Sequence, residues 1–205
     1  MADEPMNSPV SLTMKLDLIP GDIFATKGEG IVGRVCRSIF TPDTDRFHHC
    51  LLWQKTDEGD WVILESIGKG IAVSRLSEYK NRDIKFYRVN CPDEIRNQVC
   101  PELTKWGRYS YDYLLIVKIA IAALGVLLRN YLTGKFRKIT ADNLPYAKDA
   151  HFICIEAIDL PYYHLGFTII PPTRMPVPSA VKQAELEGRI TEIKMTADRT
   201  EPKGG

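Results

Sequence analysis

The sequence lacks an excess of charge of either sign and has no long basic run. Its 205 residues include 27 Lys and Arg against 26 Asp and Glu, which gives a formal net charge of +1. Proteins that bind nucleic acid gather Lys and Arg into a patch that neutralises phosphates. We therefore expect no nucleic-acid partner.

The cysteines lack both the even number of a disulfide framework and the CxxC spacing of a zinc ribbon. There are five of them: Cys36, Cys50, Cys91, Cys100 and Cys154. An odd, scattered set is typical of reduced thiols in a cytosolic protein. The sequence therefore predicts free thiols, with no metal and no cofactor.

The first 18 residues lack the basic segment and the continuous apolar segment of a secretory signal. This favours a cytoplasmic location, and it leaves open peripheral membrane association and export by a route that needs no signal. The oligomeric state is open as well.

No hydrophobic run reaches the length of a bilayer span. The most apolar stretch, residues 114–128, has 15 residues and contains Lys118, whereas a span needs about 20. The stretch is typical of a buried packing helix. The alternative is contact with a membrane surface or a hydrophobic ligand, which the basic residues that follow would suit: Arg129, Lys135, Arg137 and Lys138.

A chain of this length suits one compact domain. We expect flexible tails at 1–15 and 197–205 around a domain at 16–196, which contains a helical insertion at about 92–140. Alternating and apolar runs predict strands at 23–25, 48–54, 61–66, 70–76 and 83–89. Helical spacing predicts helices near 31–40, 92–106, 111–131, 154–160 (ended by Pro161) and 178–188, the last capped by Ser179 and ended by Gly188. The fold class is therefore α+β.

The runs HHCLLWQ and WVILES predict a hairpin that could build a catalytic pair. If the loop is centred on Asp57, His49 lies opposite Glu65, and the two share a face of the ribbon. Opposite residues have Cβ atoms about 4.5–5.5 Å apart, so a carboxylate can hold an imidazole. A structural polar pair is the alternative interpretation. His48 points to the other face and is the weaker candidate.

Cys154 follows a polar segment and lies near the start of an apolar run with helical spacing, FICIEAIDL. A cysteine at a helix N-terminus is favoured as thiolate by the helix dipole and unpaired amides. The alternative is an inert core thiol. His151, three residues earlier, is a rival base for it.

In their order, the motifs of the chain resemble those of the permuted NlpC-type papain-like cysteine hydrolases, which include the YiiX-like proteins and, distantly, lecithin retinol acyltransferase. The similarity covers roughly residues 18 to 190. It rests on IPGDIFAT (19–26), FHHCLLW (47–53), VILESIGKGIAV (62–73), YSYDYLL (109–115), FICIEAI (152–158) and PVPSAVKQAELEG (176–188). The chain departs from the family pattern at Ile155, where the family often has Ser, and at Leu51, where it has Gly.

The resemblance implies a circularly permuted papain-like fold, with an antiparallel sheet or small barrel packed against helices. It also implies a Cys-His-Glu triad for acyl transfer: Cys154 as nucleophile, His49 as base and Glu65 orienting the imidazole. Tyr111 is a candidate oxyanion or substrate contact. The expected activity is that of a peptidase or amidase, with cell-wall peptides as one substrate class. The alternatives are a lipid acyl hydrolase or acyltransferase and a non-catalytic module that keeps the fold.

Overall fold

The computed structural model describes residues 14–27, 46–67, 70–107, 113–134, 154–172, 177–194 and 196–197. The strands are β1 (Met14–Lys15), β2 (Ile23–Lys27), β3 (Arg46–Lys55), β4 (Trp61–Ile67), β5 (Gly70–Arg75), β6 (Ile84–Val89), β7 (Ile190–Ile193) and β8 (Thr196–Ala197). The helices are the 3₁₀ helix η2 (Leu76–Tyr79) and the α-helices α2 (Asp93–Thr104), α3 (Tyr113–Thr133), α4 (Cys154–His164) and α5 (Pro178–Leu186). The helix predicted near 31–40 lies outside the described residues.

Six strands form one antiparallel sheet in the order β5-β4-β3-β2-β6-β7. This confirms the α+β class and the antiparallel sheet. Among the described strands the sheet is open, with β5 and β7 at its edges, so the small-barrel alternative is wrong. The strands most central to the order, β3 and β2, are also those that carry the FHHCLLW and IPGDIFAT motifs.

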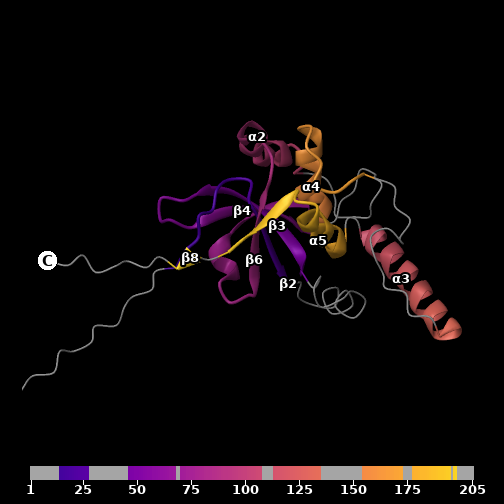
Figure 1. The fold of residues 1–205 in the computed structure, drawn as a ribbon. Helices are drawn as coiled ribbons and strands as arrows, with labels where there is room; N and C mark the ends of the chain where they lie inside the picture. The colour runs from indigo at the N-terminus through magenta and orange to yellow at the C-terminus, as the bar shows by residue number, and fades with distance from the viewer. Residues whose placement is uncertain are drawn as a thin grey trace, which may run out of the picture.

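The two faces of the sheet bury two separate cores. Helices α2, α4 and α5 cover one face, where Ala25, Leu51 and Leu64 of the strands pack with Cys154; these helices lie together on one side of the sheet in Figure 1. We call this the helix-covered face. The opposite face is a smaller core of Phe24, Cys50, Leu52, Trp61, Ile63, Tyr79 and Phe86, closed in part by η2.

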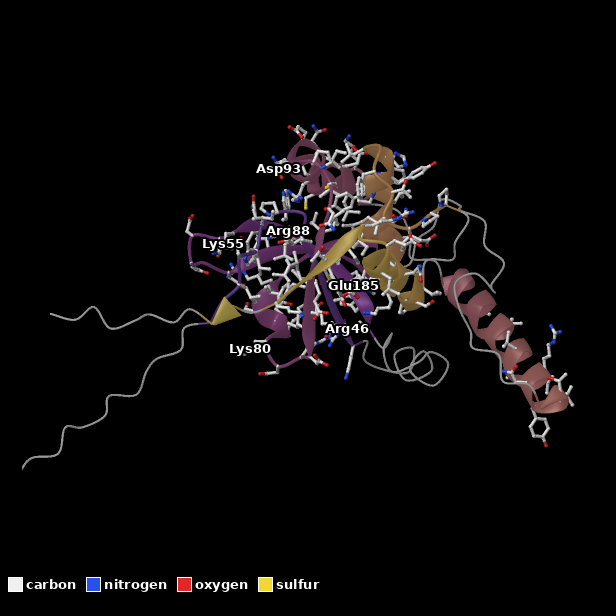
Figure 2. All side chains as sticks on the ribbon, viewed as in Figure 1. Arg46, Lys55, Lys80, Arg88, Asp93 and Glu185 are labelled. Atoms are coloured by element: carbon white, nitrogen blue, oxygen red, sulfur yellow. The ribbon has the colours of Figure 1, made fainter. Side chains whose placement is uncertain are left out.

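A tight turn places the start of β2. Gly21 has a positive φ of 85°, a conformation that only glycine adopts without strain. A Cβ there would also lie 2.6 Å from Arg96 Cγ. The next residue, Asp22, is fully buried and accepts hydrogen bonds at 3.0 and 2.9 Å from Arg88, which fix the turn against β6; Arg88 is labelled in Figure 2.

Three details differ from prediction. Pro161 lies inside α4 and does not end it, because burial of nearly the whole helix outweighs the lost backbone hydrogen bond. The N-cap of α5 is Val177, with Pro178 in the first turn, and Ser179 does not cap it; proline is well suited to that position because its missing N–H has no partner there. The segment at 14–15, placed in the tail, pairs with 196–197 as β1 and β8.

Most of the large apolar side chains described on helix α3 are exposed, so the prediction of a buried packing helix is wrong, although Val126 is partly buried against the helix-covered core. Figure 1 shows it apart from the other helices. Its large apolar side chains are 53% to 85% exposed at Val117, Ile121, Leu124, Leu128, Tyr131 and Leu132. None of the described helices combines the length and apolarity needed to cross a membrane.

Candidate active site

The pairing of β3 with β4 differs by one residue from the predicted register. Lys55 pairs with Trp61, so the loop is centred one residue later than Asp57, and a bulge at Trp53 then shifts the register again. Beyond the bulge, Cys50 lies opposite Glu65. Because side chains alternate along a strand, this offset puts His49 and Glu65 on opposite faces. The predicted His49–Glu65 pair is therefore wrong.

Glu65 instead binds groups on the opposite face. Its Oε2 lies 2.8 Å from His48 Nε2 and accepts a hydrogen bond of 2.6 Å from the Tyr79 hydroxyl, while Ser74 Oγ donates to Oε1. Burial alone would raise the pKa of Glu65, but the hydrogen bonds from His48, Ser74 and Tyr79 outweigh it and lower the pKa to about 2. The carboxylate is thus ionised and fully engaged away from His49.

His49 lies on the helix-covered face. It pairs with Ala25 of β2 and is 1% exposed. Burial, with smaller contributions from the charges of His48 and Arg46, lowers the pKa of His49 to about 3. Its Nδ1 is buried and has no hydrogen-bond partner. The imidazole is therefore neutral near pH 7 and has an unsatisfied ring nitrogen.

Ser66 is the residue that the observed register brings to His49. It follows Glu65 on β4, so its side chain lies on the helix-covered face, and the register continued by one residue puts it opposite His49. Its Oγ is buried and, like His49 Nδ1, has no hydrogen-bond partner. Two unsatisfied polar atoms thus lie on neighbouring strands, although the sequence prediction assigned the orienting role to Glu65.

Cys154 is the first residue of α4, as predicted, and is 6% exposed. It belongs to the same buried cluster as Ala25, Leu51 and Leu64, which are on the face that bears His49. Burial and the charge of Glu65 raise the pKa of Cys50, and Cys154 contributes further to the rise, as expected of a thiol that lies close to β3. The structure therefore brings Cys154 and His49 to the same side of β3.

The other candidate residues are less informative. Tyr111, His151 and Cys36 lie outside the described residues. Burial raises the pKa of Cys100 to about 12, and its thiol donates to the Leu52 carbonyl at 3.3 Å. Such a thiol is a poor nucleophile.

No protein-family model matches the chain, and no curated protein has a significantly similar sequence. The function is therefore inferred from the site's geometry and from the motifs.

Proposed function

We propose that the protein is a thiol hydrolase of the permuted papain-like type, with Cys154 as nucleophile and His49 as general base. The observation that supports it most is the placement of Cys154 at the N-terminus of α4, on the face of β3 that bears His49. The first amides of a helix have no partner within it and favour negative charge beside them. A thiolate and an oxyanion are both stabilised in such a place.

The reaction needs only the two side chains and an acyl donor. Neutral His49 takes the proton of the Cys154 thiol, and the thiolate sulfur attacks the substrate carbonyl. The bond to the leaving amine or alcohol breaks as the imidazolium returns its proton to that group. Water, activated by the same imidazole, then cleaves the thioester. A lipid alcohol or an amine in the place of water would make the protein an acyltransferase.

Ser66 takes the orienting role in this proposal. A hydroxyl that accepts a hydrogen bond from His49 Nδ1 fixes the tautomer in which Nε2 is the base. The two atoms have no other partner, and a buried polar pair left unsatisfied is costly. A hydrogen bond between the two would satisfy both atoms and would make Ser66 a positioning residue for His49.

Peptide amides are the substrate class that the motifs favour, and cell-wall peptides are the particular class that the resemblance suggests. The mechanism itself requires only an acyl group on a leaving amine or alcohol. A simple activated ester is therefore a suitable first probe.

Acylation of Cys154 tests the proposal. The protein is mixed with p-nitrophenyl acetate, quenched in acid, and each cysteine-containing peptide is weighed by mass spectrometry. We expect the acetyl group on Cys154, and its loss with the initial burst of nitrophenol in Cys154→Ser. Cys100→Ser, which removes a buried thiol of α2, is the matched control and should keep the burst. Acylation spread evenly over the thiols, or absent, would contradict a catalytic role and favour the non-catalytic module.

A second candidate is a lipid acyl hydrolase or acyltransferase with the same Cys154 and His49. It is favoured by the exposed apolar side of α3, where Val117, Ile121, Leu124 and Leu128 recur at spacings of four and three residues. Such spacing lines one side of a helix. Figure 2 shows the side chains drawn on α3 well apart from those of the sheet. Exposed Arg129 at the end of this row adds positive charge that suits an anionic membrane.

Vesicle flotation separates the two candidates. At low salt the wild-type chain should float with vesicles that contain phosphatidylserine, and Leu124→Glu should stay in the soluble fraction, because a charge on the apolar side opposes insertion. Leu186→Glu, on α5, changes an equally exposed leucine and should still float. A wild-type protein that remains soluble under these conditions would exclude the membrane-directed candidate.

A further inference from the structure

On the opposite face of the sheet, three potential metal ligands converge. They are His48 and Cys50 of β3 and Glu65 of β4, and their ligand atoms all lie within 4.8 Å of one another. We call these residues the β3–β4 cluster. Cys50 is fully buried, Glu65 is 6% exposed, and the His48 side chain is 21% exposed. None of the three takes part in the thiol chemistry proposed for Cys154.

A single nitrogen atom stands at the centre of the cluster. His48 Nε2 lies 2.8 Å from Glu65 Oε2, 3.1 Å from the Tyr79 hydroxyl and 3.4 Å from Cys50 Sγ. The Tyr79 hydroxyl already donates to Glu65, so the ring nitrogen is shared by the Glu65 carboxylate and the Cys50 sulfur, and it has only one hydrogen or one lone pair for the two. A cation at this place could accept lone pairs from the His48 nitrogen, the Cys50 sulfur and the Glu65 carboxylate at the same time.

The same geometry makes a second catalytic triad a poor explanation. In a triad the carboxylate binds one ring nitrogen and the nucleophile faces the other. Here Glu65 and Cys50 both contact Nε2 of His48. Cys50 also lies in the middle of a strand, without the helix amides that stabilise a thiolate.

We propose that His48, Cys50 and Glu65 bind a divalent transition-metal ion, Zn²⁺ being the best match. Imidazole, thiolate and carboxylate are all zinc ligands, with metal–ligand bonds of about 2.0–2.3 Å. In a tetrahedral site such bonds place ligand atoms about 3–4 Å apart, close to the separations within the cluster. Calcium and magnesium prefer oxygen ligands alone, so the thiol and imidazole disfavour them.

Charge supports a divalent ion. When the ion binds, the Cys50 sulfur forms a bond to the metal and its proton leaves to solvent. One thiolate and one carboxylate then balance the two positive charges, with neutral His48 as third ligand. The positive group of Arg82 lies 4.6 Å from the ring centre of Tyr79, which borders the cluster.

An outer shell holds the ligands in place. Tyr79, from η2, donates to Glu65 Oε2, and Ser74, from β5, donates to Oε1. Hydrogen bonds of this kind orient metal ligands, and their loss typically weakens binding about 10–100-fold. The Tyr79 hydroxyl is also close enough to His48 to border the fourth coordination position. The site therefore links β3, β4, β5 and η2, with one position left for water or for Tyr79.

Cobalt titration of the full chain tests the site, since Co²⁺ reports its ligands by colour. After dialysis against a chelator, we expect one equivalent of Co²⁺ to bind with a thiolate-to-cobalt charge-transfer band, release of protons, and displacement by Zn²⁺. Cys50→Ser should lose the band. Tyr79→Phe should keep the band and weaken binding about 10–100-fold. Cys100→Ser and Cys154→Ser, which remove thiols outside the cluster, should match the wild type.

Two results would overturn the proposal: no cobalt band in the wild type, or a band that persists in Cys50→Ser and disappears in Cys100→Ser or Cys154→Ser. If Cys50→Ser fails to fold by circular dichroism, His48→Gln serves in its place, since it keeps the thiol and removes the central ligand. Esterase activity of Cys154 is measured in parallel. A variant that loses cobalt binding but keeps acylation of Cys154, or the reverse, shows that the metal site and the proposed active site are independent.

Discussion

Replacement of His49 by Ala should slow the acylation of Cys154 by about 10²–10⁴-fold, the contribution of a positioned general base. The reason is that His49 is the buried imidazole on the face where Cys154 packs. Ser66→Ala should slow the reaction less, and with a changed pH dependence, because it removes only the group that orients the ring. Stopped-flow detection of nitrophenol release gives the acylation rates of the wild type, His49→Ala and Ser66→Ala.

His164→Ala is the matched control for this series. His164 ends the helix that Cys154 begins, and it is exposed, so its loss tests helix α4 without touching the base. It should acylate at the wild-type rate. An equal loss in His49→Ala and His164→Ala would indicate damage to the fold, and an unchanged rate in His49→Ala would remove His49 from the mechanism.

The second large effect is on stability in acid. The pKa of His49 is about 3 in the folded chain, against an ordinary value of 6.5, so the folded state resists a proton that the unfolded state accepts. The contribution of His49 to the free energy of unfolding is therefore fully present above pH 6.5 and is lost as the pH falls toward 3. From pH 7 to pH 5 the loss from this one group is about 2 kcal/mol, at about 1.4 kcal/mol per pH unit.

Urea unfolding at pH 7 and pH 5 measures this loss. This pH range lies above the pKa of Glu65, which is about 2 in the folded chain against an ordinary value of 4.5, so that carboxylate contributes little to the loss. His49→Gln, which cannot charge, should lose about 2 kcal/mol less than the wild type over this range. His164→Gln, an exposed histidine on α4, should behave like the wild type. Equal losses in all three proteins would show that His49 is not held neutral.

Most of the secondary structure was predictable, because it depends on local pattern. Alternation and turn residues predicted β3 to β6, and helical spacing with Pro92 predicted α2. Strand β7 was missed, since four residues next to a helix end give little periodicity, and it exists through its pairing with β6. The exposure of α3 could not be predicted from its composition, which a buried helix shares.

The register of the hairpin could not be predicted, and the site depends on it. A loop displaced by one residue and a bulge at Trp53 leave the net register shifted by one, and a one-residue shift exchanges all partners across the strands. As a result Glu65 lies on the face of His48 and Cys50, and Ser66 lies opposite His49. One signal was available from the sequence: His48 and Cys50 are two residues apart on a strand and so must share a face.

The most direct test of the proposed active site is the rate of alkylation of each cysteine by limiting iodoacetamide between pH 5 and pH 8, read by mass spectrometry. If Cys154 and His49 form the reacting pair, Cys154 is alkylated fastest of the five thiols near pH 7, where neutral His49 can accept its proton, and the advantage disappears in His49→Ala but not in His164→Ala. Alkylation of Cys154 no faster than that of the other thiols, in the wild type and His49→Ala alike, would contradict it.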